Sequence, residues 1–410
     1  LKHAGLVVFV SSVDEVADEQ IQVVHNMYDV CSPETATDTW CSTYGARRYF
    51  EPSAFGLNGY MDKFGFSKFD EAQEYLDKEY ENTLKNAGWE KAREFRRKNP
   101  RFIEDALTPS SAVCQFDFEL LNKRREAIMD WPITSDKKPV LSQLEWIENM
   151  KTVSVKPMPE YRDFNVNAKF NISGHPDIPN NIQQLFDKKI PLNVGKYIAS
   201  LDPIDYNKGQ LNVNTKSSKP ALRVKRILDM SIDGDKFDEL GNPKNRGLDF
   251  ETNRTVLTYF FRPDDTKDLW DDIAKILIYY GCPLIYERST RSVFDYLDER
   301  GMSGFLLDAK GNLITDETRD NYGIKTSEPA KRNYFDTTRN YINTFVNAER
   351  HIECIDQLIT VTPKSMPKHD IATAYMILEC VDSAVAYKYR DSISDKKLKE
   401  ILSNLNFARQ

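Results

Sequence analysis

The stretch that most constrains the fold is Tyr197–Asp202, a short apolar run that stops at a carboxylate and is followed by Pro203. Apolar runs of this length, bounded by turn residues, predict a buried strand, which would deliver Asp202 to the end of a sheet. Taken alone, an Asp before a Pro is more simply a turn residue, because Asp-Pro opens many turns. A second run of the same kind, Pro283–Glu287, favours the strand interpretation, and a third acid, Asp370, begins an amphipathic helix.

Length and composition are those of a globular protein with more than one domain. The 410 residues are 40% hydrophobic and 11% aromatic, which is enough for two or three ordinary cores. No apolar run reaches the length of a membrane span, and the N-terminus lacks the basic-then-apolar order of a signal peptide. We therefore expect a cytoplasmic protein that is not secreted and has no membrane partner. The six cysteines include no CxxC pair, so we interpret them as reduced core residues.

The N-terminal half predicts an incomplete α/β domain. The apolar, β-branched run Gly5–Val10 predicts a buried strand, and such strands need neighbours on both sides, so we expect that part of its sheet lies upstream. Residues 70–97 predict one long, charge-rich helix. A polar connection follows, with prolines at positions 157, 159, 176 and 179. We place the domain boundary there, at residue 160, with a margin of about twenty residues.

The second half alternates strands and helices. Residues 221–228 and 255–261 predict strands, residues 265–280 predict a helix that ends at Gly281, and residues 283–287 predict another strand. Helices are also expected over residues 331–350 and from Asp370 onward. If strand 283–287 lies beside and parallel to strand 197–201, their carboxyl ends meet at one edge, as at ligand sites of open α/β sheets. Asp202 and Glu287 would then lie close together.

Carboxylates gathered in this way predict a metal site. Crowded acids repel one another, and binding hard cations relieves that repulsion through oxygen ligands. Two Mg²⁺ or Mn²⁺ ions, roughly 3.5–4 Å apart, can activate water and stabilise the leaving oxygen in phosphodiester cleavage. His369 is the one histidine beside an acid of this set, and it is either an outer-sphere or general-base group or an ordinary polar residue at a helix start.

A basic segment lies directly after the first acid. Residues 206–228 contain no acid but carry six cations, Lys208, Lys216, Lys219, Arg223, Lys225 and Arg226. Such a segment can follow a phosphate backbone, or it can be a solvated hairpin; the neighbouring acids favour the phosphate interpretation. The net charge of −7 argues against general coating by nucleic acid, so a local patch would be required.

The order of these elements resembles the RNase H-like nuclease domain of the large terminase subunit of tailed bacteriophages. Ile198–Asp202 resembles the family's first acidic motif, Leu284–Glu287 the second, and Lys368–Ala374 the third. The stretch Tyr322–Thr326, followed by Lys331, is similar to the segment before the family's late helices.

The resemblance also covers the N-terminal half. Gly65–Ser67 and Asn99–Ala106 resemble the end of a terminase ATPase domain. It implies an α/β protein in which residues 1–160 are the C-terminal portion of a P-loop-type domain and a linker. Residues 161–410, with a core at about 190–410, would form an RNase H-like mixed sheet with flanking helices. No G-x-x-x-x-G-K-[ST] occurs, and no apolar strand ends in paired acids, so we expect no ATP hydrolysis from this chain alone.

The function implied by the resemblance is that of a Mg²⁺- or Mn²⁺-dependent endonuclease that cuts concatemeric DNA during viral genome packaging in the host cytoplasm. Asp202, Glu287 and Asp370 would be the catalytic and metal-binding residues for two Mg²⁺ or Mn²⁺ ions. Asp205, the acid nearest the first motif, and His369 are accessory candidates. Implied partners are double-stranded DNA, the portal and the small terminase subunit.

Two other classes fit the same residues. A resolvase- or transposase-type RNase H-like nuclease would share the three acids without the ATPase-like first half. In a non-catalytic packaging or structural module, the acids would be a helix cap and two turn residues. Metal binding separates this last class from both nucleases.

Overall fold

The computed structural model describes residues 49–106, 114–132, 134–158, 169–203, 219–239, 243–245, 248–263, 265–288 and 291–389. The chain divides into two compact units, Leu1–Val113 and Cys114–Gln410. The division therefore falls earlier than the expected boundary at residue 160. The predicted strand Gly5–Val10 lies outside the described residues.

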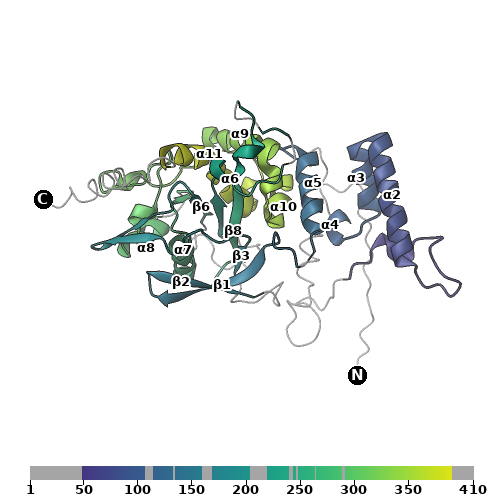
Figure 1. The fold of residues 1–410 in the computed structure, drawn as a ribbon, viewed down its shortest axis with the longest axis horizontal. Helices are drawn as coiled ribbons and strands as arrows, with labels where there is room; N and C mark the ends of the chain where they lie inside the picture. Colours follow the sequence, from purple (N-terminus) through teal and green to yellow (C-terminus); the bar gives the residue numbers. More distant parts are fainter. Residues whose placement is uncertain are drawn as a thin grey trace, which may run out of the picture. The chain divides into compact units, whose positions relative to one another are not determined.

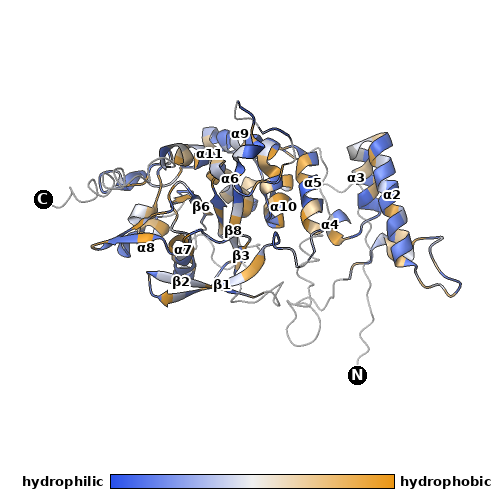
Figure 2. Ribbon diagram, viewed as in Figure 1, coloured by the Kyte–Doolittle hydropathy of each residue, from blue (hydrophilic) through white to orange (hydrophobic). Residues whose placement is uncertain are grey.

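The described part of the first unit is helical. It comprises η2 (Ser53–Gly56), α2 (Phe69–Ala87), α3 (Trp89–Lys98) and α4 (Ile103–Ala106). The prediction of one continuous helix over residues 70–97 is wrong, because Gly88 adopts φ +81° and ψ 176° and separates α2 from α3. Arg96 then reaches back to Asp77 at 2.9 Å, which ties the two helices together. α2 is mostly hydrophilic (Figure 2), as its charge-rich sequence implies.

The second unit is built on a seven-stranded mixed sheet flanked by helices, which confirms the α/β class (Figure 1). Its strand order is β2-β1-β3-β8-β7-β6-β9. Only the β6–β9 pair is parallel among the pairings of this sheet in the described part of the chain. The strands are β1 (Val140–Glu148), β2 (Thr152–Pro157), β3 (Phe170–Ile172), β6 (Tyr197–Asp202), β7 (Ala221–Arg226), β8 (Arg254–Phe260) and β9 (Leu284–Tyr286).

Strands β1 and β2 explain why the domain boundary lies earlier than expected. β1 pairs with β3, so both strands extend the sheet that carries β6 and β9. Helix α5 (Phe118–Met129) also belongs to this unit and packs on α10 (Ile352–Thr360). A separate two-stranded sheet is formed by β4 (Ile182–Leu185) and β5 (Lys188–Pro191).

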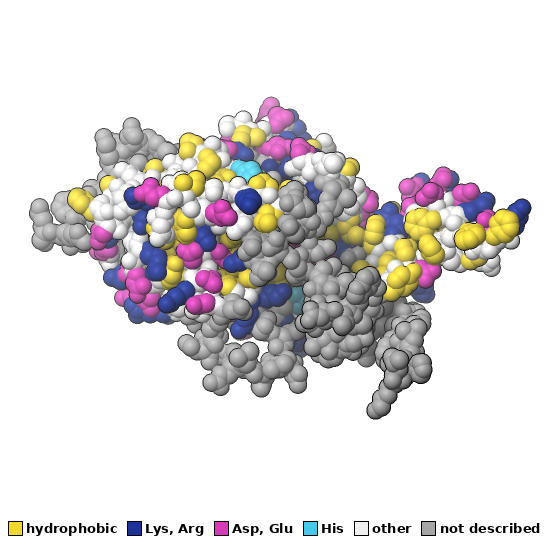
Figure 3. All heavy atoms as spheres, turned by 90° about the horizontal axis from the view of Figure 1, so that it is seen from below, with side chains coloured by type: hydrophobic (Ala, Val, Ile, Leu, Met, Phe, Trp, Pro, Cys, Tyr) yellow, Lys and Arg dark blue, Asp and Glu magenta, His cyan; other side chains and the backbone are white. Residues whose placement is uncertain are grey.

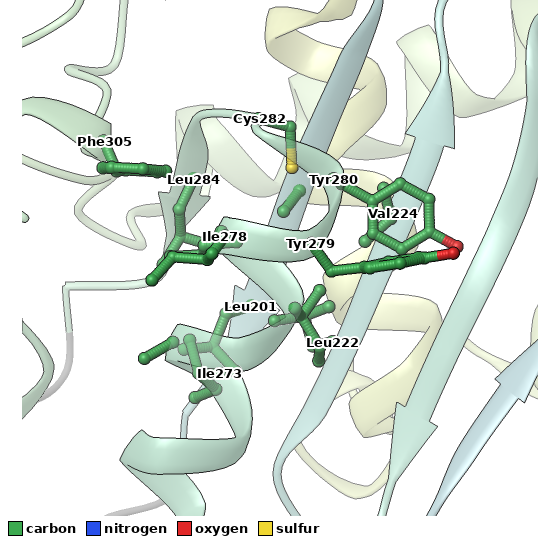
Figure 4. Packing of buried hydrophobic residues seen from close by; sticks show 14 of the residues in the cluster. Leu201, Leu222, Val224, Ile273, Ile278, Tyr279, Tyr280, Cys282, Leu284 and Phe305 are labelled. Carbon is green, nitrogen blue, oxygen red and sulfur yellow. The ribbon is translucent and has the colours of Figure 1, made fainter. Parts of the chain in front are cut away.

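One face of the sheet is covered by α7 (Thr266–Tyr280), whose expected start and end are confirmed. The Asp265 side chain accepts a hydrogen bond from the Lys267 amide at the start, and Gly281 adopts the left-handed conformation at the end. Alternate β6 residues Tyr197, Ala199 and Leu201 join the α7 side chains in the main core. In Figure 4, Leu201 lies between Ile273 and Ile278 of α7, and Val224 lies beside the ring of Tyr280.

The other face carries α9 (Glu328–Phe345) and α11 (Asp370–Tyr389), and α11 packs on β6, β7 and β9. Shorter helices complete the unit: α6 (Met230–Asp233), η4 (Gly234–Lys236), α8 (Ser292–Glu299), η5 (Ser303–Phe305), η6 (Arg319–Asn321), η7 (Val346–Ala348) and η8 (Met366–Lys368). Of the helices that the structure describes, none is apolar over a stretch long enough to cross a membrane.

The acidic insertion between β7 and β8 folds around a buried carboxylate. Asp233 accepts hydrogen bonds from the backbone amides of Glu251 (3.1 Å) and Thr252 (2.8 Å) and pairs with Lys236 at 2.7 Å. These bonds, and the Lys236 charge, lower the pKa of Asp233 although burial opposes them. The carboxylate is thus occupied by protein donors and stabilises the loop.

Candidate carboxylate site

The parallel pairing of β6 and β9 brings Asp202 and Glu287 to the same edge of the sheet. Leu201 is in register with Tyr286, and the Glu287 amide donates to the Leu201 carbonyl at 3.1 Å. The next residue on each strand is therefore an acid at a shared carboxyl end, as the sequence predicted. Asp202 and Glu287 are both partly exposed, so the pair is accessible from solvent.

The electrostatics of Asp202 show that the acids are close together. Its pKa is raised well above the ordinary value, first by burial, then by the negative charges of Glu287 and Asp370, and by a hydrogen bond with Glu287. Together with the strand register, these charges place the three acids near one another.

Asp370 approaches the pair from α11. It is the first residue of that helix and is 8% exposed. One of its carboxylate oxygens, Oδ2, accepts from the backbone amide of Lys219 at 3.0 Å. The basic segment is thus hydrogen-bonded, through the Lys219 backbone, to the third acid of the site.

Glu287 has a partner that the sequence did not single out. Ile324 pairs with Glu287 in a short parallel bridge, through bonds to the Tyr286 carbonyl (2.9 Å) and from the Arg288 amide (2.8 Å). Thr326 lies just beyond this bridge, and its hydroxyl donates to Oε1 of Glu287. In the sequence, Thr326 was marked only by its position in the stretch Tyr322–Thr326, which resembles a terminase segment.

Tyr334 of α9 is a second neighbour that the sequence analysis placed only on a core-facing helix surface. It is 1% exposed. Burial raises the pKa of its phenol, the charges of Cys380, Glu287 and Asp202 raise it further, and a hydrogen bond with Thr326 lowers it. The phenol therefore lies beside the Thr326 hydroxyl and near the acids.

His369, an accessory candidate, has hydrogen-bond partners within the protein at both ring nitrogens. Its Nδ1 bonds to the Ser365 carbonyl at 2.9 Å and its Nε2 to the Thr360 hydroxyl at 3.0 Å. The carbonyl accepts only, so Nδ1 carries the proton and Nε2 accepts from Thr360. Both nitrogens are thus occupied, and the ring connects the end of α10 to the turn that precedes Asp370.

Two of the six predicted DNA-binding cations are buried, so that part of the prediction is wrong. Arg223 and Lys225 are each 0% exposed on β7. Arg223 pairs with Glu379 at 2.7 Å, and Lys225 pairs with Glu379 (2.7 Å) and Asp382 (2.6 Å) of α11. These cations attach α11 to the sheet and cannot contact a phosphate backbone in this fold.

The other predicted contacts lie in three different settings. Lys219 is exposed, with its ammonium group 5.2 Å from the centre of the Phe260 ring. Arg226 is partly buried and pairs with Asp177 at 3.2 Å. Lys208, Lys216 and the accessory candidate Asp205 lie outside the described residues. On the face drawn in Figure 3, acidic and basic side chains are interspersed.

The donor chemistry of this site suits hard cations, since all three groups are carboxylates. Within the described ranges, however, no three His, Cys, Asp or Glu side chains are arranged so that they could hold one metal ion.

Comparison with known proteins adds no family to this geometry: no protein-family model matches the chain, and no curated protein matches it in sequence.

Proposed function

We propose that this chain is a Mg²⁺- or Mn²⁺-dependent endodeoxyribonuclease whose site consists of Asp202, Glu287 and Asp370. The observation that carries the proposal is the meeting of two acids at the carboxyl ends of adjacent parallel strands, with a third acid at the start of α11. Each acid by itself has an ordinary explanation as a turn or cap residue. Their shared location, where mutual repulsion disfavours ionisation, has no such explanation and is typical of functional sites.

The topology supports an RNase H-like nuclease. β6, β7 and β8 form an antiparallel meander, and β9 returns through α7 to lie parallel to β6 on its other side. Parallel bridges from Leu284 to Leu306 and from Glu287 to Ile324 continue the sheet beyond β9. In this arrangement the acids lie at the carboxyl ends of β6 and β9, and a nucleic-acid backbone would approach from that end of the strands.

The chemistry follows from the charge of the site. Bound hard cations would supply a nucleophilic water and stabilise the leaving oxygen of the phosphodiester. Asp202 and Glu287 would hold these ions from the strand ends, and Asp370 would complete the set from the helix side. Lys219 is held at Asp370 through its own backbone, which leaves its exposed ammonium group available to a phosphate.

The biological setting proposed is genome packaging by a tailed bacteriophage, in the host cytoplasm, with the portal and small terminase subunit as partners. Its support is the resemblance of the three acidic motifs and of Tyr322–Thr326 to large terminase subunits. The chain lacks a P-loop motif, so the proposed activity is cleavage without ATP turnover. The runner-up is another RNase H-like nuclease of the resolvase or transposase type.

Plasmid nicking with Mn²⁺ or Mg²⁺ tests the proposal. Asp202→Asn, Glu287→Gln and Asp370→Asn should each lower the rate at least about a hundredfold, a loss typical of removing one electrostatic group at a reacting centre. The fold should persist in each variant, because the change relieves repulsion. Asp316→Asn is the matched control, since this acid pairs with Lys188 at the surface.

The outcomes separate the candidate functions. Nicking that survives in all three variants would remove these acids from the site. A preference for branched over linear duplex DNA would favour a resolvase. Absence of both Mn²⁺ binding and cleavage in the unmodified chain would leave the non-catalytic module.

A further inference from the structure

Glu287 is oriented by a segment that is distant in sequence. The bridge between Glu287 and Ile324 aligns residues 322–326 alongside β9. Tyr322 anchors this segment in the core, where it stacks on Tyr286 with ring centres 5.7 Å apart. The Thr326 hydroxyl is thereby placed to donate to Oε1 of Glu287. Thr326 is itself exposed, so this bond lies at the mouth of the site.

The buried phenol of Tyr334 lies beside this bond. Tyr334 is 1% exposed on α9, it is hydrogen-bonded with Thr326, and its phenol is close enough to Glu287 and Asp202 to be affected by their charges. Thr326, which donates to Glu287, is therefore itself in contact with a second hydroxyl from the buried helix α9.

We propose that Thr326 and Tyr334 are positioning residues for Glu287, with Thr326 fixing one carboxylate oxygen and Tyr334 supplying a second hydroxyl donor on the buried side. This inference rests on the proposed metal-dependent function. Hydrogen bonds to a ligating carboxylate restrict its rotation, so its remaining lone pairs point in one direction.

Two pairs of variants of the full chain test the positioning role. Thr326→Val and Tyr334→Phe each remove only a hydroxyl donor. Thr337→Val is the control for the first, because the Thr337 hydroxyl contacts the Cys380 sulfur and backbone carbonyls. Tyr279→Phe is the control for the second, because its buried hydroxyl is hydrogen-bonded with His175 at 2.9 Å, at the C-terminal end of α7.

The readouts are Mn²⁺ binding by calorimetry and the Mn²⁺ dependence of plasmid nicking. We expect Thr326→Val and Tyr334→Phe to raise the Mn²⁺ concentration for half-maximal cleavage by about 10- to 100-fold, as for other groups that support metal ligands. Cleavage at saturating Mn²⁺ should change less. Thr326→Ser should restore the Mn²⁺ dependence, since it restores the donor. A merely structural role would lower thermal stability and leave the metal dependence unchanged.

The possible failures are distinguishable. If the unmodified chain binds Mn²⁺ and nicks DNA while Thr326→Val and Tyr334→Phe behave like their controls, the positioning role is overturned and the proposed function stands. If the unmodified chain does neither, the proposed function fails and the positioning role fails with it. Tyr334→Phe keeps the ring in its buried place and removes only the hydroxyl, so it keeps the test valid should Thr326→Val fold poorly.

Discussion

Arg223 and Lys225 illustrate how the surroundings of a residue decide its role. Both lie in a segment whose sequence suggests phosphate binding, yet both are inside the protein between β7 and α11. The guanidinium group of Arg223 also lies over the ring of Tyr375, 3.5 Å from its centre. Buried cations are tolerated only when they are paired and hydrogen-bonded, and here two α11 carboxylates provide that pairing.

The first residue-scale prediction concerns Lys225. Lys225→Met should destabilise the protein by about 3–5 kcal/mol, because it leaves the Glu379 and Asp382 carboxylates buried without one of their cations. Urea unfolding followed by circular dichroism measures the change. Lys219→Met, at the exposed end of the same strand region, should alter stability little. Equal stability of Lys225→Met and the unmodified chain would show that the ion pairs contribute nothing net.

At the scale of elements, the turn from α7 into β9 decides where Glu287 lies. Gly281 adopts φ +56° at the end of α7, and only two residues separate it from β9. Its amide bonds to the Ile278 carbonyl at 3.1 Å, which ends the helix. A Cβ at this position would lie 2.4 Å from the Asn181 carbonyl oxygen. Both the backbone conformation and the space therefore require glycine.

We accordingly predict that Gly281→Ala destabilises the second unit by at least about 1–3 kcal/mol, the usual range for a residue forced into a sparsely populated backbone region. The clash with Asn181 adds to this cost. Thermal unfolding of the purified variant provides the measurement. Gly234→Ala is the comparison, since Gly234 has φ −62° and open space around its Cβ position. Similar melting temperatures for the two variants would contradict the assignment.

Over the whole molecule, every described residue of the site belongs to the unit Cys114–Gln410. Its main core includes Leu144 of β1 and Val153 of β2, two strands that the sequence analysis assigned to the first domain. Truncation at residue 160 would therefore remove two strands from the sheet. Truncation after Val113 leaves the sheet intact.

We predict that a fragment covering residues 114–410 folds cooperatively and keeps the Mn²⁺ binding and nicking activity of the full chain, whereas residues 161–410 do not fold. Loss of β1 and β2 would remove Leu144 and Val153 from the core and expose the edge of β3, with its core side chains Phe170 and Ile172, which invites aggregation. Size-exclusion chromatography and circular dichroism of the two fragments test this. A well-folded 161–410 fragment would show that β1 and β2 are dispensable.

The sequence by itself determined the features that depend on neighbouring residues. We could recognise the apolar runs of β6 and β9, the glycine that ends α7 and the acid at the end of each strand from the sequence. Strand burial and helix capping depend on residues within a few positions of one another. The expected helix over residues 70–97 failed at Gly88, where backbone conformation outweighs the charge pattern. Within the second unit, the parallel pairing of β6 with β9 followed from local signals and the usual geometry of crossovers.

Only the tertiary structure decided which polar groups face each other across long separations. Arg223 meets Glu379 over 156 positions, and Thr326 meets Glu287 over 39. The basic pattern of β7 could not show that its partners are acids on α11, and no periodicity marks the Thr326 and Tyr334 hydroxyls as neighbours of the acids. Such pairings are set by how the sheet and helices pack, because electrostatic and hydrogen-bond energies depend on distance in space and not on separation along the chain.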